Sequence, residues 1–407
     1  MPDAIDTAVV VCPQPELPEG EVLGVRVAGI PLLTRTLLAA QGAGIERFAI
    51  VATGAQQAVL RDQLKHEPRL RGRIQWFEPT QGPAPEFPYS LVLSSSIIVD
   101  AGALRAWLSR LNGHGRVVAP DAGWISPLVV PSALLPIYID AALHGSNGVT
   151  RFLEGLQKEH QLEEISWGGV GQLPVRSLAE VATVERAMLA AAQSPEDGPI
   201  VDRFVNRAVS VRFTRWLIAS HVTPNQLTCT SLVAGLAGAW LLGGEGVLKS
   251  LGGLVLFQLS VILDHVDGEI ARLKFLSSRL GKWLDNFGDH VVGLAVVGVL
   301  TWRVARYGPI AQFIGLGVAA ALGITLAFLV VFLWSVSAQR LKVRTTIPAQ
   351  CLARALTFLA NRDGFCLALW VTILLGQPTW FLWALALGAN AYWGLWLFIY
   401  GLPSRSG

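Results

Sequence analysis

The chain has few cysteines and few charged residues, and each scarcity excludes a class of protein. Its cysteines stand far apart, with no CxxC pair and no spacing typical of a disulfide framework, so we expect free thiols. They are Cys12, Cys229, Cys351 and Cys366. Only 15% of the residues are charged and the net charge is +3, without a basic and aromatic array, so we expect no nucleic-acid partner. The N-terminus lacks the basic segment of a signal peptide, which favours a cytoplasmic first domain.

Apolar residues, by contrast, are abundant and unevenly distributed. They make up 52% of the 407 residues, and the mean hydropathy is +0.48, which is typical of a membrane protein. The first half mixes charges, prolines and short apolar runs, whereas long apolar runs dominate from Leu227 onward. We therefore expect a Rossmann-like α/β domain over 1–193, a linker and interfacial helix over 194–220, and an all-α membrane domain with six spans over 221–402.

The first domain shows strand and helix patterns in alternation. Short β-branched runs predict strands, and segments with helical period predict helices, which together are typical of a parallel, doubly wound sheet. The predicted strands are 7–12, 47–54 and 89–100, and the predicted helices are 32–44, 55–67 and 178–193.

Between Ile200 and Ser220, arginines alternate with apolar residues. This pattern predicts an amphipathic helix in the membrane interface, with its arginines toward lipid head groups. An ordinary surface helix is the alternative interpretation, and the position directly before the first apolar segment favours the interfacial one. The arginines are Arg203, Arg207, Arg212 and Arg215.

Six apolar segments follow, and basic residues are concentrated in alternate connections between them. By the positive-inside rule, this distribution places both termini and the 264–289 region at the cytoplasmic face of the cytoplasmic membrane. The segments are 226–243, 250–266, 283–304, 308–336, 362–377 and 379–400.

The region from 264 to 289 carries aspartates within otherwise apolar sequence. Asp264 and Asp267 are three residues apart and Asp285 and Asp289 are four apart, so each pair shares one face of a helix. Carboxylates at membrane depth normally mark function, and several together need a cation, since like charges otherwise force protonation. Oxygen ligands favour Mg²⁺, Mn²⁺ or Ca²⁺, and such a site is suited to a phosphate or diphosphate. A solvated loop between two spans is the alternative.

Small and basic residues lie close to these aspartates in sequence. Gly268, Ala271 and Gly281 would allow a bulky ligand to approach the backbone, and Arg272 can donate to a phosphate.

The aspartates and these neighbours together form a specific motif. Asp264-x2-Asp267-Gly268-x2-Ala271-Arg272-x8-Gly281-x3-Asp285-x3-Asp289 resembles, at every fixed position, the motif of the CDP-alcohol phosphotransferases. The segment TPNQLT at 223–228 is similar to the family's usual entry into its first span, with one residue fewer between Asn225 and Thr228.

The resemblance, over about 200–402, implies a homodimeric membrane enzyme that moves a phosphoalcohol from a CDP-linked donor to a hydroxyl acceptor and releases CMP. It implies that two divalent ions, Mg²⁺ or Mn²⁺, are bound by the four aspartates, Asp264, Asp267, Asp285 and Asp289. Asp289 would also be the general base. Gly268, Ala271, Arg272 and Gly281 would surround the cytidine nucleotide.

Two further groups of residues could either bind a substrate or have an ordinary structural role. Asn225 and Thr228 could hold the nucleotide or simply cap a helix. Arg344, Arg354 and Arg362 could bind an acceptor phosphate, or they could be ordinary positive-inside residues.

Residues 27–54 resemble the sugar-phosphate nucleotidyltransferases, whose fold is Rossmann-like. The loop at 11–21 lacks that family's glycine cluster and arginine, and Ile30 stands where the family has lysine. Ser94, Ser95 and Ser96 stand where it has a metal-binding aspartate, with Asp100 several residues on. The resemblance therefore implies a degenerate domain without nucleotidyltransferase activity.

An inactive first domain cannot supply a CDP-polyol, which makes CDP-diacylglycerol the favoured donor, with a small polyol or polyol phosphate as acceptor. One alternative is a CDP-polyol donor such as CDP-inositol with a polyol-phosphate acceptor. Another is a non-catalytic membrane scaffold, against which the complete set of aspartates argues.

Overall fold

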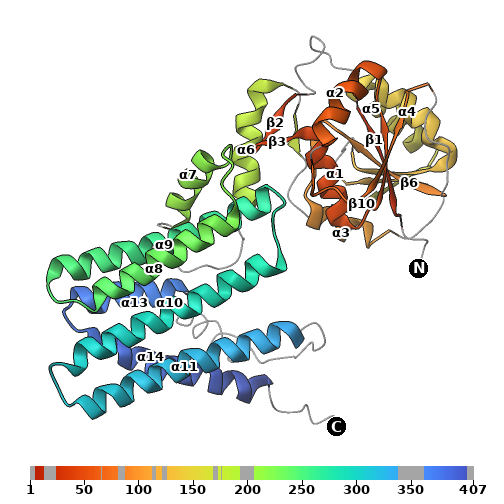
Figure 1. Ribbon diagram of the computed structural model, residues 1–407. Helices are drawn as coiled ribbons and strands as arrows, with labels where there is room; N and C mark the ends of the chain where they lie inside the picture. Colours follow the sequence, from red (N-terminus) through yellow and green to blue (C-terminus); the bar gives the residue numbers. More distant parts are fainter. Residues whose placement is uncertain are drawn as a thin grey trace, which may run out of the picture. The chain divides into compact units, whose positions relative to one another are not determined.

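The computed structural model divides into two compact units, Met1–Ala191 and Ala192–Gly407. It describes residues 5–12, 24–65, 67–80, 88–111, 116–121, 126–167, 173–175, 177–192, 206–337 and 362–400. The first unit is an α/β domain and the second is helical (Figure 1).

The first unit is built on one seven-stranded sheet with the order β10-β8-β9-β6-β1-β4-β5. Strand β1 lies at its centre and pairs in parallel with β4 and β6, as expected for a buried β-branched run. The strands are β1 (Thr7–Val11), β4 (Arg47–Val51), β5 (Arg73–Phe77), β6 (Tyr89–Ser94), β8 (Val117–Pro120), β9 (Leu128–Pro131) and β10 (Leu162–Ile165).

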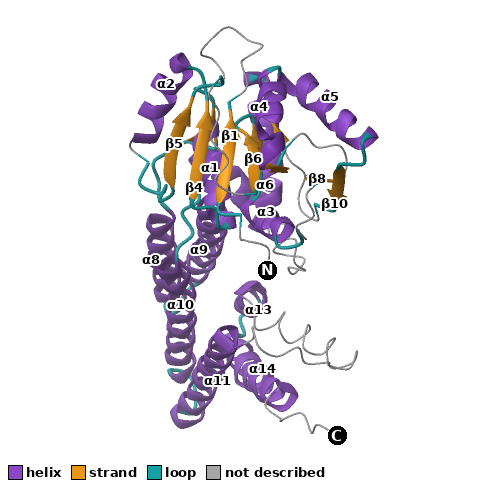
Figure 2. Ribbon diagram, turned by 90° about the vertical axis from the view of Figure 1, so that its right-hand side faces the viewer, coloured by secondary structure: helices purple, strands orange, loops and turns teal. Residues whose placement is uncertain are grey.

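Helices cover both faces of this sheet (Figure 2). Successive strand side chains point to opposite faces, so Ala8 and Val10 of β1 enter one apolar cluster, whereas Val9 and Val11 enter another. Helices α1 (Leu32–Ala43), α2 (Gly54–Lys65) and α3 (Ala101–Leu108) bury leucines in the first cluster. Helices α4 (Leu135–Leu143) and α5 (Gly145–Lys158) complete the second, with Tyr138 at its centre. The result is the three-layer α/β arrangement that the sequence predicts.

The sheet differs from the prediction in two places. It is not wholly parallel, because β9 is antiparallel to both β6 and β8. Only residues 121–127 connect β8 to β9, which is too short for the crossover that a parallel neighbour requires. The predicted strand 89–100 is also interrupted: β6 ends at Ser94, and β7 (Ile97–Ile98) forms a separate antiparallel pair with β11 (Leu173–Pro174).

The remaining elements of this unit are short, apart from its last helix. Strands β2 (Arg26–Val27) and β3 (Ile30–Pro31) form a small hairpin ahead of α1, and the 3₁₀ helix η1 (Ser132–Leu134) precedes α4. Helix α6 (Leu178–Ala192) lies where the sequence predicts a helix over 178–193.

Within its described residues, 206–337 and 362–400, the second unit contains an initial short helix and six longer apolar ones. Each predicted apolar segment corresponds to one helix, within a few residues at each end. The helices are α7 (Arg207–Leu217), α8 (Pro224–Leu242), α9 (Val247–Leu273), α10 (Arg279–Ala305), α11 (Ile310–Ser337), α13 (Arg362–Leu374) and α14 (Pro378–Tyr400).

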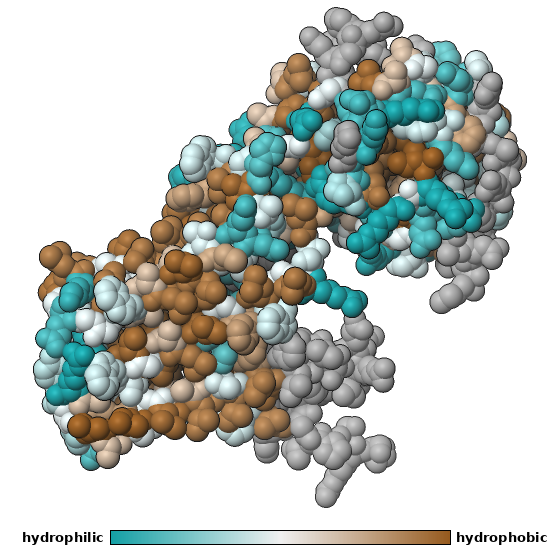
Figure 3. Space-filling view, viewed as in Figure 1, coloured by the Kyte–Doolittle hydropathy of each residue, from teal (hydrophilic) through white to brown (hydrophobic). Residues whose placement is uncertain are grey.

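Three of these helices are long and apolar enough to cross a membrane, within the part of the chain that the structure describes. They are Val247–Leu273, Arg279–Ala305 and the described part of α11, Ile310–Val330. Small residues allow close helix contact: a Cβ on Gly238 would lie 2.9 Å from the Gly253 carbonyl oxygen, so α8 and α9 meet through backbone. Figure 3 shows broad apolar surface along the sides of this unit, as expected for helices that face lipid.

Candidate active site

The motif lies on a helical hairpin formed by α9 and α10. Helix α9 ends in a Schellman motif: Phe275 adopts a left-handed backbone with φ 54°, and the Leu276 amide donates to the Ala271 carbonyl at 2.8 Å. Ser278 then caps α10 by accepting a hydrogen bond from the Gly281 amide at 2.9 Å. The short turn 274–278 therefore brings the end of α9 and the start of α10 together.

Three of the four predicted aspartates form a cluster across this hairpin. Asp264 and Asp267 of α9 and Asp285 of α10 each offer a carboxylate oxygen within 4.8 Å of the others. Asp267 is 6% exposed, and Oδ1 of Asp285 is buried without a hydrogen-bond partner. Asp289 follows one turn later on α10 and lies outside this closest group.

The donor set fits a hard divalent cation. It consists of carboxylate oxygens only, and their mutual repulsion at this separation requires a compensating charge or a proton. The partnerless Oδ1 of Asp285 is a further sign that a ligand is needed, because buried oxygens in proteins almost always have a partner. Within the described residues, no other group of three histidine, cysteine or acidic side chains converges in this way.

Thr228 supports the cluster from α8. Its hydroxyl lies 2.5 Å from Oδ2 of Asp267 and 3.1 Å from the Pro224 carbonyl, so its single proton points to the nearer, charged oxygen. The cap of α8 is made instead by Thr223 and Gln226, which form a capping box. Capping therefore does not explain Thr228, and this hydroxyl fixes one orientation of the Asp267 carboxylate.

The two motif glycines each border a polar side chain. A Cβ on Gly281 would lie 3.4 Å from Oδ1 of Asn225, so Asn225 reaches the start of α10. A Cβ on Gly268 would lie 3.2 Å from Nη1 of Arg272, whose guanidinium folds back over this glycine. The side chain of Ala271 is partly buried on the same helix. The space beside Gly268 that the sequence assigns to a nucleotide is thus bordered by Arg272.

The predicted acceptor-binding arginines cannot be placed in the same way. Arg344 and Arg354 lie outside the described residues, and Arg362 is the first residue of α13.

The first unit has no acidic cluster at the corresponding place among its described residues. At the end of β6, the hydroxyls of Ser94 and Ser96 lie 2.8 Å apart, and Ser126 accepts from the Ser94 amide. Asp100 is the N-cap of α3 and accepts from the Ala103 amide at 2.7 Å. Burial raises the pKa of the Cys12 thiol to about 12, against a smaller lowering by a hydrogen bond from Ser95, so this thiol stays protonated.

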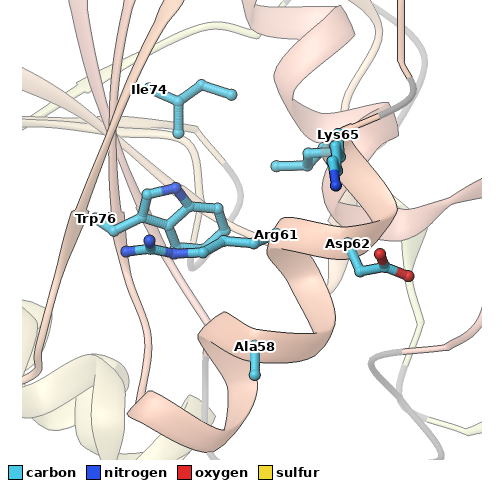
Figure 4. A pocket seen from close by; sticks show the side chains of 7 residues that line it. Ala58, Arg61, Asp62, Lys65, Ile74 and Trp76 are labelled. Carbon is cyan, nitrogen blue, oxygen red and sulfur yellow. The ribbon is translucent and has the colours of Figure 1, made fainter.

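A hollow of about 520 Å³ lies on the same unit, between α2 and the edge strand β5 (Figure 4). Arg61 lies over the ring of Trp76, at 5.2 Å from its centroid, and Ile74 and Lys65 also line the hollow. Its charged side chains are few and of both signs, and it holds none of the residues that the sequence analysis assigns to a site.

The sequence analysis missed a polar cluster between α7 and α9. Ser210 and Thr214 of α7 both donate to the Glu269 carboxylate, at 2.8 and 2.5 Å. The only sequence signal is the i, i+4 spacing of the two hydroxyls, which places them on one helix face.

Comparison with known proteins identifies the helical unit. Residues 221–389 match the sequence profile of the CDP-alcohol phosphatidyltransferase family, and the aspartate cluster lies inside this range. The C-terminal region belongs to this family. The prediction made from the aspartate motif is thereby confirmed, and the helical unit is a CDP-alcohol phosphotransferase domain.

Two curated relatives extend the comparison. A bifunctional IPC transferase and DIPP synthase of Thermococcus kodakarensis is 32% identical over 148 residues, which are 36% of this chain and 33% of that protein. A protein of the same name from Aquifex aeolicus is 27% identical over an alignment of 316 residues, which covers 69% of this chain and 72% of that protein. The chain thus spans about a third of the first relative and almost three quarters of the second.

Among solved structures, the inositol-1-phosphate CTP transferase of T. maritima matches with a TM-score of 0.35 at 11% identity. The match covers 48% of this chain and all of the other.

Proposed function

We propose that this chain transfers a phosphoalcohol group from a CDP-linked donor to a hydroxyl of a small polyol or polyol phosphate and releases CMP. The observation that carries the proposal is the convergence of Asp264, Asp267 and Asp285 within a CDP-alcohol phosphotransferase domain. CDP-diacylglycerol is the favoured donor, and the product is then a phospholipid.

Asp264, Asp267, Asp285 and Asp289 would hold two divalent ions, Mg²⁺ or Mn²⁺. Bound there, the ions neutralise the donor diphosphate and stabilise the departing CMP. The chain's own contribution is to fix the carboxylates, as Thr228 does for Asp267.

Asp289 is the proposed general base. It takes the proton from the acceptor hydroxyl as the hydroxyl oxygen bonds to the donor phosphorus that carries the alcohol. The bond from that phosphorus to the bridging oxygen breaks, and CMP leaves with this oxygen. Asp289 lies one turn beyond Asp285, outside the closest group of carboxylates. This position supports the assignment, because a metal ligand that must also accept a proton suits the edge of the cluster.

Gly268, Ala271, Arg272, Gly281, Asn225 and Thr228 are the proposed nucleotide-binding residues. The closeness of Asn225 to Gly281 supports a role for the start of α8 in this site, since a side chain at 281 would crowd Asn225. Arg344, Arg354 and Arg362 are proposed to bind a phosphate on the acceptor.

The donor assignment depends on the first unit. We infer that it is a degenerate nucleotidyltransferase, because Asp100 is occupied as a helix cap and hydroxyls replace carboxylates at the end of β6. A domain of this composition has little to offset the charge of a nucleoside triphosphate.

A second candidate has a specific observation in its favour. The Aquifex relative aligns over 69% of the chain, which is more than the second unit alone contains, so the alignment extends into the first unit. The name of this relative combines a transferase with a DIPP synthase. This favours a soluble CDP-polyol, such as CDP-inositol, as donor and a polyol phosphate as acceptor.

We further propose six spans, a cytoplasmic active site and a homodimer. Helices at all six predicted segments support the first proposal, and the distribution of basic residues supports the second. A non-catalytic scaffold is disfavoured, since it would have no need of the three converging carboxylates.

The test is CMP release by the purified full-length protein in detergent with Mg²⁺ or Mn²⁺. CDP-diacylglycerol and CDP-inositol are each offered with inositol, inositol 1-phosphate and glycerol 3-phosphate. CMP release with CDP-diacylglycerol supports the first candidate, and release with CDP-inositol alone supports the second. No CMP release with any combination would refute the enzymatic function.

A further inference from the structure

Helix α7 buries a polar face, not an apolar one. Asn206, Ser210 and Thr214 lie four residues apart and are each 0% exposed. Of its apolar side chains, Phe213 is 36% and Trp216 77% exposed, whereas Leu217 at its end packs against an apolar cluster that contains Leu263 and Ile270. A helix whose buried stripe is polar is held by specific hydrogen bonds, since it gains little from apolar burial.

Hydrogen bonds join this face to α9, the helix that carries Asp264 and Asp267. The Gln258 amide donates to Asn206 at 2.5 Å, and Lys274 donates to the Ser220 carbonyl at 2.6 Å. Between these points, Glu269 accepts the two hydroxyl protons of Ser210 and Thr214. Glu269 is 3% exposed, so this buried carboxylate depends on the two donors from α7.

Glu269 and Asp267 lie on nearly opposite sides of α9. They are two residues apart, so their side chains point about 160° away from each other. Asp267 is bonded to Thr228 of α8, and Glu269 is bonded to α7. The last turns of α9 are therefore tied on both sides, which fixes the rotation of the helix about its own axis.

Rotation is the motion to which the carboxylate cluster is most sensitive. A carboxylate oxygen lies about 6 Å from the helix axis, so a rotation of roughly 20° moves it by about 2 Å. Metal ligands tolerate distance changes of only about 0.2 Å. Loss of the hydrogen bonds between α7 and α9 would therefore let α9 rotate and would misplace Asp264 and Asp267 relative to Asp285.

We propose that Glu269 is a positioning residue, which through Ser210 and Thr214 locks α9 in the rotation that the metal-binding carboxylates require. This role rests on the proposed function, because it presumes that the cluster binds a divalent cation. Ser210 and Thr214 belong to this device, although neither lies in the aspartate motif.

The experiment measures Mn²⁺ binding to the full-length protein in detergent, from the electron paramagnetic resonance signal of free Mn²⁺. The double variant Ser210→Ala/Thr214→Val removes both donors and is expected to raise the Kd by about tenfold or more. Glu269→Ala is expected to match it. Glu269→Gln should stay within about threefold of wild type, because an amide can accept from one hydroxyl and donate to the other.

The control is Thr372→Val, which removes a buried hydroxyl that bonds within its own helix α13. Its Kd should equal that of wild type. If the double variant does not fold, Ser210→Ala alone, which keeps the Thr214 bond, should show an intermediate rise. Near-ultraviolet circular dichroism and gel filtration establish folding in each case.

The outcomes separate this inference from the proposed function. A folded double variant with a Kd within twofold of wild type would overturn the positioning role, and so would Glu269→Gln as damaging as Glu269→Ala. Wild-type protein that binds Mn²⁺ but releases no CMP would overturn the proposed reaction and leave the positioning role intact. Wild-type protein that binds no Mn²⁺ would overturn both.

Discussion

Replacing Thr228 by valine tests whether the hydroxyl on α8 sustains the metal-binding geometry. Valine keeps the shape of threonine but cannot donate to Oδ2 of Asp267, so a carboxylate that is 6% exposed loses one hydrogen bond. A hydrogen bond to a charged group contributes about 1.5–3 kcal/mol, which corresponds to about 10- to 150-fold in an equilibrium constant. Loss of such an outer partner typically lowers metal affinity or activity by about 10- to 100-fold. We therefore expect the Mn²⁺ concentration for half-maximal CMP release to rise by at least about tenfold.

The matched control is Thr230→Val, two residues further along the same helix. Thr230 is exposed, and its hydroxyl bonds only to the Gln226 carbonyl at 2.8 Å within α8. CMP release is measured across a Mn²⁺ titration at saturating donor, with folded protein quantified by gel filtration. A Thr228→Val enzyme whose Mn²⁺ requirement stays within twofold of the Thr230→Val control would refute the argument that this bond orients Asp267.

Three other outcomes are expected. Asp289→Asn should lower kcat by about 10²- to 10⁴-fold without disturbing the fold, since a general base contributes this much. Retained turnover in a rapid CMP assay would contradict its role. Gly281→Val should raise the KM for the donor by about tenfold without changing Mn²⁺ binding, because the valine side chain would crowd Asn225 and Ser278. An unchanged KM would argue against a nucleotide beside α10. Burial raises the pKa of Cys12 to about 12, so this thiol should resist a thiol reagent at pH 8.5 until urea unfolds the first unit. The stability that this protonated thiol contributes to the folded state is present below pH 9 and is lost as the pH rises toward 12. Labelling is measured in a protein with the other cysteines replaced, and fast labelling of the folded protein would contradict the burial of Cys12.

The fold of the first unit could be predicted where its elements are long and regular. Strand β1 is a continuous run of mostly β-branched residues and helices α1 and α6 carry helical patterns, and each lies within two residues of its predicted bounds. The direction of β9 could not be predicted in the same way. Strand polarity depends on connection length and on the neighbouring strand, and a four-residue strand leaves little signal in the sequence.

The candidate site could likewise be predicted only where it depends on local spacing in the sequence. The aspartates could be assigned because their spacings are local and helical geometry alone places each pair on one face. The ties of Glu269 and Thr228 are tertiary: Ser210 and Glu269 are 59 residues apart, and Thr228 and Asp267 are 39 apart. The inward polar face of α7 is likewise decided by its partner α9, because the isolated sequence also fits a helix with its arginines toward lipid.

The hairpin of α9 and α10 has a consequence for the biogenesis of the protein. All three clustered carboxylates lie between residues 264 and 285, so the set is complete before α11, α13 and α14 have been synthesised. Contacts this close in sequence form early, because little loop entropy opposes them. The carboxylates repel one another until a cation or proton arrives, which couples closure of the hairpin to cation uptake. A cation bound at this two-helix stage would therefore stabilise the closed hairpin before the later helices are added.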